Sequence, residues 1–206
     1  MLSFRPKSLL AQLVRSPAHS ALICLALLTL LGSLSWSVDW LGYDAVAMRS
    51  GEFWRPFTAW ITQLNLRHWL LNQWGLIVLW LLWPARQPLK ALLPYLVVWL
   101  LCSVALAVSD YDRYVGLSGL LYGWLVIGAV RTRAYPVWVQ LLFLLILSGK
   151  VILENIQPSG GRDWVGELIA ADVAHESHLW GLLSGWLCVV IDWLRQQVQS
   201  MRVSPD

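Results

Sequence analysis

Apolar residues along the chain fall into six long runs separated by short polar stretches. The runs cover residues 20–38, 68–83, 92–108, 117–130, 136–153 and 178–194. Several runs are shorter than the roughly 20 residues that cross a bilayer, but helix ends that extend into the flanks would make up the difference. The pattern predicts an all-α, polytopic membrane protein with a bundle of six transmembrane helices.

The fourth run, 117–130, is confined by polar residues on both sides. Residues 110–113 precede it, and Arg131 and Arg133 follow it. Its length at a rise of 1.5 Å per residue gives a helix of roughly 21 Å, shorter than the membrane is thick. A helix anchored at its arginine end would therefore begin inside the membrane, so we expect Ser118 in its first turn to be submerged.

The segment 39–67 is too polar to span a membrane and unusually rich in large apolar side chains. These residues are Trp40, Phe53, Trp54, Phe57, Trp60 and Leu64. Such a composition favours a segment that lies in the membrane interface. We expect one domain over residues 1–206, with cytoplasmic segments at 1–19 and 195–206 and an interfacial outer loop at 39–67.

Composition and charge support a polytopic membrane protein. Of 206 residues, 58% are hydrophobic and 13% charged, with 15 Trp, a residue that gathers at membrane interfaces. If the N-terminus lies inside, nine Lys and Arg fall on the inner side and six on the outer, which predicts that both termini are cytoplasmic. A nucleic-acid partner is disfavoured, because no polar segment carries a basic stripe with interleaved aromatic residues.

The three cysteines, Cys24, Cys102 and Cys188, all lie in apolar runs. Their odd number and wide spacing argue against disulfides and zinc, so we interpret them as packing residues and expect no metal or cofactor. In 175–178 two histidines are three residues apart, whereas a zinc protease helix needs them four apart. We instead expect His175 and Glu176 to face an aqueous entrance.

Ser118 and His178 are the residues that suggest chemistry. A serine hydroxyl needs a base to become a nucleophile, and His178 is the best base available. Both residues begin their apolar runs and fall on the same side of the membrane in the predicted topology. Gly119 and Gly123 share one helical face, as do Gly181 and Gly185 with His178. Small residues let membrane helices approach closely, so these faces would bring the serine and the histidine together.

Three further residues would complete such a site. Tyr122 lies one turn after Ser118 and is expected to stack on the imidazole of His178. His68 and Asn72 share one helical face and would donate hydrogen bonds to an oxyanion, together with the backbone N–H groups of Ser118 and Leu117. For Asn72, an ordinary interhelical hydrogen bond remains an alternative.

Together these residues resemble the rhomboid intramembrane serine proteases. The matching pattern is Trp54-Arg55, His68-x-x-x-Asn72, Gly116-x-Ser118-Gly119 with Tyr122, and His178-x-x-Gly181-x-x-x-Gly185. The resemblance implies that Ser118 is the nucleophile, His178 the base, His68 and Asn72 oxyanion donors, and Tyr122 a ring that packs on His178. It also implies that 39–67 is the membrane-embedded loop of that family.

Within the rhomboids the chain looks most similar to the rhombosortases. Residues 114–119 resemble their serine motif, and Lys150-x-x-x-Glu154 resembles their fifth helix. This implies an enzyme of the bacterial inner membrane that cleaves proteins with a C-terminal transmembrane sorting tail of the GlyGly-CTERM type. The new C-terminus would be released to water or transferred to an anchoring amine.

Several alternatives remain at this stage. The chain could be a general rhomboid protease for other single-span substrates, or an inactive rhomboid-like protein that binds transmembrane helices. A transporter is disfavoured because paired charges and broken helices at mid-depth are missing from the pattern. Lys150 and Glu154 could pair with each other at i, i+4 or orient a substrate, and Gly160 and Gly161 are interpreted as turn residues.

Overall fold

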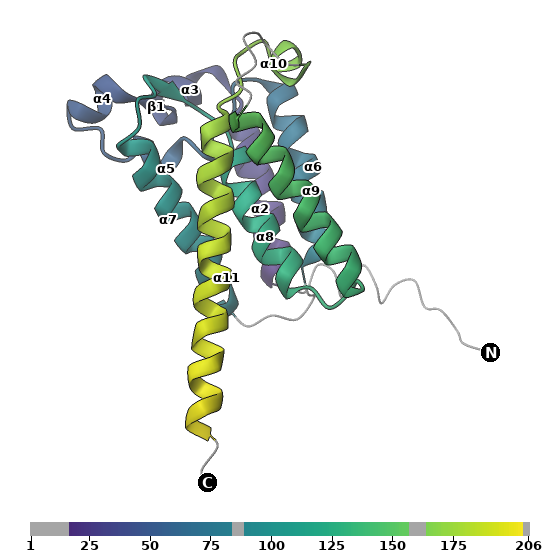
Figure 1. Cartoon of the computed structure of the whole chain (residues 1–206). Helices are drawn as coiled ribbons and strands as arrows, with labels where there is room; N and C mark the ends of the chain where they lie inside the picture. The colour runs from purple at the N-terminus through teal and green to yellow at the C-terminus, as the bar shows by residue number, and fades with distance from the viewer. Residues whose placement is uncertain (1–16, 84–88, 157–163, 204–206) are drawn as a thin grey trace.

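The computed structural model describes residues 17–83, 89–156 and 164–203, and within these ranges it is mostly helical. Each of the six predicted apolar runs overlaps one long helix. These helices are α2 (Pro17–Leu31), α6 (Leu66–Leu82), α7 (Leu93–Ala107), α8 (Ser118–Arg131), α9 (Val137–Ile156) and α11 (His175–Val203), and they form a bundle (Figure 1). The prediction of a helical protein is confirmed apart from two short strands, and α8 begins within one residue of its expected start.

Two of the helices are long and apolar enough to cross a membrane by themselves. They are Val137–Ile156 and His175–Met201. A third span results if α2 and α3 (Ser35–Leu41), which meet at a bend of 100°, are counted as one. Among the described helices, α7 and α8 are apolar but shorter.

The remaining elements are short, and most of them lie at the upper end of the bundle in Figure 1. They are α3, β1 (Tyr43–Asp44), α4 (Ala45–Arg49), α5 (Arg55–Thr58), the 3-10 helix η1 (Leu89–Leu92), β2 (Arg113–Tyr114) and α10 (Trp164–Ile169). Strands β1 and β2 pair in antiparallel register, with Tyr43 opposite Tyr114. This pairing ties the segment after α3 to the loop that leads into α8.

Helix α8 is the centre of the bundle and packs against α6, α7, α9 and α11. Its closest neighbour is α11, because glycines face each other across the contact. A β-carbon added to Gly123 would lie 2.5 Å from the carbonyl oxygen of Gly181, and one added to Gly185 would lie 2.5 Å from that of Gly123. The predicted meeting of the two glycine faces is therefore confirmed.

The first apolar run is not one straight helix, contrary to the prediction for 20–38. It breaks after Leu31 because the chain returning from the next segment crosses it at Gly32. A β-carbon on Gly32 would overlap the carbonyl oxygen of Ile61. The carbonyl oxygen of Gly32 accepts hydrogen bonds from the backbone N–H of Gln63 at 2.8 Å and the hydroxyl of Ser37 at 2.7 Å. These bonds replace the helical ones lost at the break.

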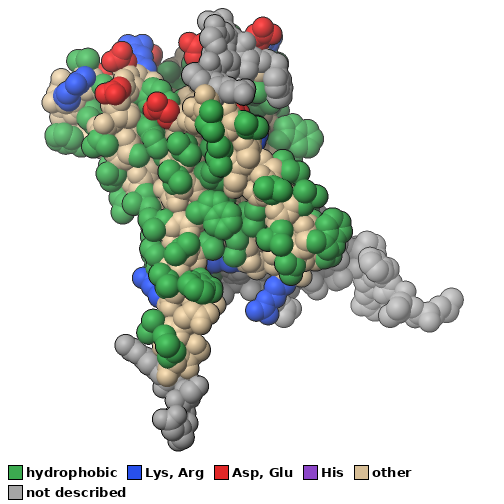
Figure 2. Space-filling view, in the orientation of Figure 1, with side chains coloured by type: hydrophobic (Ala, Val, Ile, Leu, Met, Phe, Trp, Pro, Cys, Tyr) green, Lys and Arg blue, Asp and Glu red, His purple; other side chains and the backbone are tan. Residues whose placement is uncertain are grey.

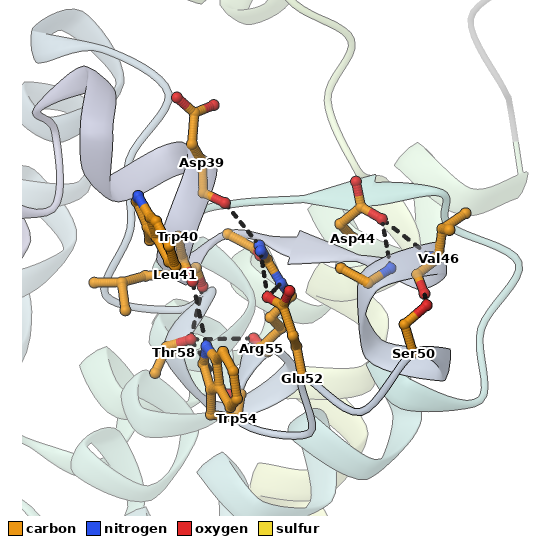
Figure 3. Close-up of polar contacts among 12 residues, drawn as sticks. Asp39, Trp40, Leu41, Asp44, Val46, Ser50, Glu52, Trp54, Arg55 and Thr58 are labelled. Atoms are coloured by element: carbon orange, nitrogen blue, oxygen red, sulfur yellow. Dashed lines mark hydrogen bonds and ion pairs between the residues drawn. The ribbon is translucent and has the colours of Figure 1, made fainter.

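The segment 39–67 folds around the buried side chain of Arg55, as Figure 3 shows. Its guanidinium donates to the carbonyl oxygens of Asp39 at 3.0 Å and Gly42 at 2.7 Å and pairs with Glu52 at 2.6 Å. The hydroxyl of Thr58 donates to the carbonyl of Leu41 at 2.7 Å. The planar, multiply donating Arg side chain thus ties the end of α3 and the turn after it to α5.

The aromatic residues of this segment divide into two groups. Trp40 and Phe53 are 66% and 69% exposed, as expected for side chains that contact a membrane interface. Trp60 is fully buried and donates from its indole to the hydroxyl of Ser103 at 3.0 Å, so its assignment as an interface residue was wrong. It packs instead against the start of α8, where its ring would meet a β-carbon on Gly119.

Charged and apolar side chains separate along the molecule (Figure 2). Hydrophobic side chains cover the long helices on this face, while Asp, Glu and some Lys and Arg gather at the end with α3, α4 and α10. Further Lys and Arg lie at the opposite end. There, Arg131 at the end of α8 pairs with Asp192 of α11 and donates to the carbonyl of Ala91 at 3.1 Å.

Some predicted features lie outside the described residues. They are most of the N-terminal segment 1–19, the last residues of the tail 195–206, and the turn at Gly160 and Gly161.

Candidate active site

Ser118 is the first residue of α8, and the loop before it is held in a conformation that requires glycine. Gly116 has φ +139°, which L side chains rarely adopt, and a β-carbon there would lie 2.8 Å from Cε1 of His68. The backbone N–H of Gly116 donates to Ala59 at 3.0 Å, and its carbonyl accepts from the hydroxyl of Tyr114 at 3.0 Å. Gly116, and with it the start of α8, is therefore held at its N–H group, at its carbonyl and by its contact with His68.

Ser118 and His178 are hydrogen-bonded to each other. The hydroxyl oxygen Oγ of Ser118 lies 3.0 Å from Nε2 of His178, and the histidine side chain is buried, with only 6% of the residue exposed. The close contact between α8 and α11 sets this distance. The predicted approach of the two side chains is confirmed, and the geometry allows the hydroxyl proton to pass to the imidazole.

Tyr122 lies against the imidazole, one turn below Ser118. The ring centroids of Tyr122 and His178 are 4.5 Å apart, at an interplanar angle of 38°. Lys150 of α9 donates from Nζ to the tyrosine hydroxyl at 2.7 Å and lies 5.2 Å from the centre of its ring. The phenol is therefore held between the lysine and the histidine.

Glu154 contacts the other side of the imidazole. Its Oε2 is 3.2 Å from Nδ1 of His178, and its Oε1 pairs with Nζ of Lys150. The i, i+4 pair of Lys150 and Glu154 expected from the sequence is present, but it lies beside the histidine and is shared with it. Ser118, His178 and Glu154 thus form a continuous hydrogen-bonded row.

His68 and Asn72, at the start of α6, face the same cavity as Ser118. Nδ1 of His68 accepts from the backbone N–H of Leu64 at 3.4 Å, which leaves Nε2 to carry the proton of a neutral ring. Asn72 is buried and donates one amide proton to Oε1 of Gln63 at 2.7 Å. An amide group has two such protons, so this bond does not exhaust it.

The cavity has a volume of about 560 Å³ and lies between α6, α8, α9, α11, the segment 39–67, and α10 with the chain that follows it. Its lining includes the predicted site residues Ser118, His178, His68, Asn72, Tyr122, Lys150 and Glu154. Leu117 is fully buried at the N-cap of α8. The first N–H groups of a helix have no partner within it, so those at the start of α8 are not used by helical hydrogen bonds.

Asp44 forms part of the cavity rim beside Arg113. Its carboxylate accepts hydrogen bonds from the backbone N–H groups of Ala47 and Val46, both at 3.0 Å, and pairs with Arg113 at 3.3 Å. The Ala47 bond most of all, with the Val46 bond and the arginine, holds the pKa of Asp44 below its ordinary value. The residue caps α4 as an anion.

Comparison with protein families matches a rhomboid domain to residues 50–195. This range covers most of the chain and includes Ser118, His178 and Glu154. The chain belongs to the rhomboid family. Rhomboids are generally intramembrane serine proteases that act on transmembrane substrates. No match to this rhomboid was found among curated proteins.

The sequence did not indicate that Glu154 contacts His178. A signal was available, because Lys150 and Glu154 are the only charged residues among residues 137–156, which form α9. Ionisable residues in membrane helices usually serve a function. Gln63, which accepts from Asn72 in this rhomboid, gave no distinct signal, and Tyr114 entered only as part of the 114–119 motif, without its bond to the Gly116 carbonyl.

Proposed function

We propose that this rhomboid is an active intramembrane serine protease with Ser118 as nucleophile and His178 as general base. The observation that carries the proposal is the 3.0 Å hydrogen bond between Oγ of Ser118 and Nε2 of His178 at the cavity. Burial among apolar helices supports it, because a serine and a histidine paired within a membrane protein are costly unless they are used. An inactive rhomboid-like helix binder has no need of this pair.

In the proposed reaction, Oγ of Ser118 attacks the scissile carbonyl while Nε2 of His178 takes the hydroxyl proton. The tetrahedral intermediate collapses as the histidine returns that proton to the leaving amine, and an acyl-enzyme remains. A water molecule or an amine then attacks the acyl carbonyl, again with His178 as the base, and Ser118 regains its proton. The product is a free carboxylate or a new amide, respectively.

The negative charge of the intermediate needs hydrogen-bond donors. We assign this role to Nε2–H of His68, the amide of Asn72 and the backbone N–H groups of Leu117 and Ser118. The hydrogen bond from Leu64 supports the donor tautomer of His68, and Gln63 supports the orientation of Asn72. The N-terminus of α8 adds a favourable dipole at the same place.

For the topology, we propose six membrane spans with both termini cytoplasmic and the cavity toward the periplasm of a bacterial inner membrane. The six long helices support the span number, and the excess of Lys and Arg near the predicted inner ends supports the orientation. The exposed aromatic residues Trp40 and Phe53 support an interfacial position for the segment 39–67.

For the substrate, we propose C-terminal transmembrane sorting tails of the GlyGly-CTERM type. The support is the resemblance of residues 114–119 and of Lys150-x-x-x-Glu154 to the rhombosortases. Small residues also suit the mechanism, because glycine destabilises a helix by roughly 1 kcal/mol relative to alanine, which lowers the cost of unwinding the scissile segment.

Cleavage in liposomes tests this function. Three substrates are compared: a protein with a sorting tail, the same protein with the small residues of the tail changed to Leu, and a single-span protein without such a tail. We expect wild type to cleave the first and Ser118→Ala to cleave none. Equal cleavage of all three would identify a general rhomboid protease and refute the tail specificity.

The mass of the new C-terminus separates the two fates of the acyl-enzyme. A free carboxylate identifies hydrolysis, and an added mass on the product identifies transfer to an amine. If folded wild type cleaved none of the substrates, the result would favour the alternative of an inactive protein that binds transmembrane helices.

A further inference from the structure

The imidazole of His178 is held at both ring nitrogens. Nε2 faces Oγ of Ser118 at 3.0 Å, and Nδ1 faces Oε2 of Glu154 at 3.2 Å. The three groups come from three different helices, α8, α11 and α9. The tilted ring of Tyr122 contacts the imidazole and can restrain its orientation, but an aromatic ring cannot determine which nitrogen carries the proton.

A carboxylate can determine it. An ionised carboxylate only accepts hydrogen bonds, so the nitrogen beside Glu154 must carry a proton. The neutral imidazole then has its lone pair on Nε2, facing Ser118, which is the tautomer that a general base needs. The carboxylate also lies close to the positive charge that His178 gains when it takes the serine proton.

Lys150 in turn fixes the carboxylate. Its Nζ pairs with Oε1 of Glu154, so that Oε2 is left for the histidine, and it donates to the hydroxyl of Tyr122 at 2.7 Å. The lysine therefore links the two side chains that contact the imidazole, Glu154 of α9 and Tyr122 of α8.

We propose that Glu154 is a positioning residue that sets the tautomer of His178 and stabilises its protonated form, so that the site works as a Ser118–His178–Glu154 triad with Lys150 as the anchor of the carboxylate. This inference rests on the proposed protease function and goes beyond a serine–histidine dyad. It also replaces the expectation that Lys150 and Glu154 orient the substrate.

The competing explanation is structural: Glu154 merely pairs with Lys150 on the surface of α9, as i, i+4 residues do. The two explanations differ in what they predict for single variants. If only the ion pair matters, then Lys150→Met and Glu154→Gln have equal effects. If the triad matters, then Glu154→Gln is far more harmful, because a Gln amide can offer Nδ1 a donor and favour the wrong tautomer.

The kinetic test uses the purified full-length enzyme in liposomes with a substrate that wild type cleaves. We expect Glu154→Gln to lower kcat by about 10²–10⁴-fold with KM changed less than threefold, as when the acid of a triad is replaced by its amide. Glu154→Asp should restore part of the rate, and Lys150→Met should lose less than Glu154→Gln. Glu167→Gln, an exposed acid on α10, is the matched control and should equal wild type.

A spectroscopic test does not depend on the variants being folded. In wild-type enzyme labelled with ¹⁵N-histidine, we expect the neutral ring of His178 to be protonated at Nδ1, with the proton shifted far downfield by the carboxylate. Protonation at Nε2 in the resting wild type would overturn the inference. So would a kcat for folded Glu154→Gln within twofold of wild type.

Failure of the triad can be distinguished from failure of the proposed protease function. If wild type reacts with a fluorophosphonate and Ser118→Ala does not, while Glu154→Gln matches wild type, the protease stands and the triad falls. If wild type itself does not react, the protease function falls, and the triad falls with it.

Discussion

Gly119 and Gly181 lie so close that a β-carbon on Gly181 would overlap the carbonyl oxygen of Gly119. The two residues belong to α8 and α11, one position after Ser118 and three after His178. The backbone contact between them therefore sets the distance between the side chains of Ser118 and His178. Glycine is needed here for the approach of two helices, and the proposed chemistry depends on that approach.

Gly181→Ala should separate α8 from α11 and lengthen the distance between Ser118 and His178. Overpacking of this kind costs about 1–3 kcal/mol of stability, and a misplacement near 1 Å can cost about 10²-fold in rate. We expect a lower unfolding temperature in detergent and a hundredfold loss of kcat. Gly149→Ala is the matched control, since its added β-carbon would meet no described atom within 4 Å beyond its chain neighbours and the backbone of its own helix. Equal behaviour of the two variants would contradict the account.

His178→Ala should abolish cleavage while the bundle stays folded, because the base is removed and its helix is retained. The control is His175→Ala, whose ring centroid lies 6.1 Å from that of His178. We expect this variant to lose less than tenfold. Cleavage assays on both purified proteins, with circular dichroism to verify folding, make the comparison. Activity retained by His178→Ala would transfer the role of base to His175.

Asn72→Ala should lower kcat by roughly tenfold to a thousandfold, the usual effect of removing one oxyanion donor. KM should change little, because the donor acts on the charge of the intermediate. Gln73→Ala is the control, since the side chain of Gln73 bonds its own helix at the carbonyl of Trp69. An unchanged kcat in Asn72→Ala would mean that the amide serves only to hold Gln63.

The six runs and the serine–histidine contact could be predicted from the sequence because both depend on spacing along a helix. Periodic apolar residues identify the helices, and glycines three or four residues apart identify faces that meet. The contact of Glu154 with His178 could not be predicted in this way. It depends on how α9 is rotated against α11, and an i, i+4 pair of Lys150 and Glu154 forms in any rotation.

The break at Gly32 and the burial of Trp60 escaped prediction for a similar reason. Both arise where the segment 39–67 folds back on the bundle, and a composition rich in aromatic residues does not show which of them turn inward. Trp40 and Trp60 look alike in the sequence, but one is 66% exposed and the other is fully buried. Their different exposure depends on the path of the chain around Arg55, which the composition does not show.

The cap of α4 should weaken in acid. Because the pKa of Asp44 is lower in the folded protein than in the unfolded chain, its contribution is complete above its ordinary value of about 4 and is lost as the pH falls through the folded value. Hydrogen exchange at pH 6 and at pH 2.5 should show reduced protection of the Val46 and Ala47 amides at the lower pH. In Asp44→Ala these amides should be equally unprotected at both. A pH-dependent difference that persists in Asp44→Ala would assign the effect to another group.

The central claim is that Ser118 is a nucleophile activated by His178, and covalent labelling tests it most directly. Purified protein in detergent is treated with a fluorophosphonate, digested and mapped by mass spectrometry. The account predicts one adduct, on Ser118, that is absent from Ser118→Ala and slowed at least a hundredfold in His178→Ala. Equal labelling of wild type and Ser118→Ala, or no labelling of folded wild type, would contradict it.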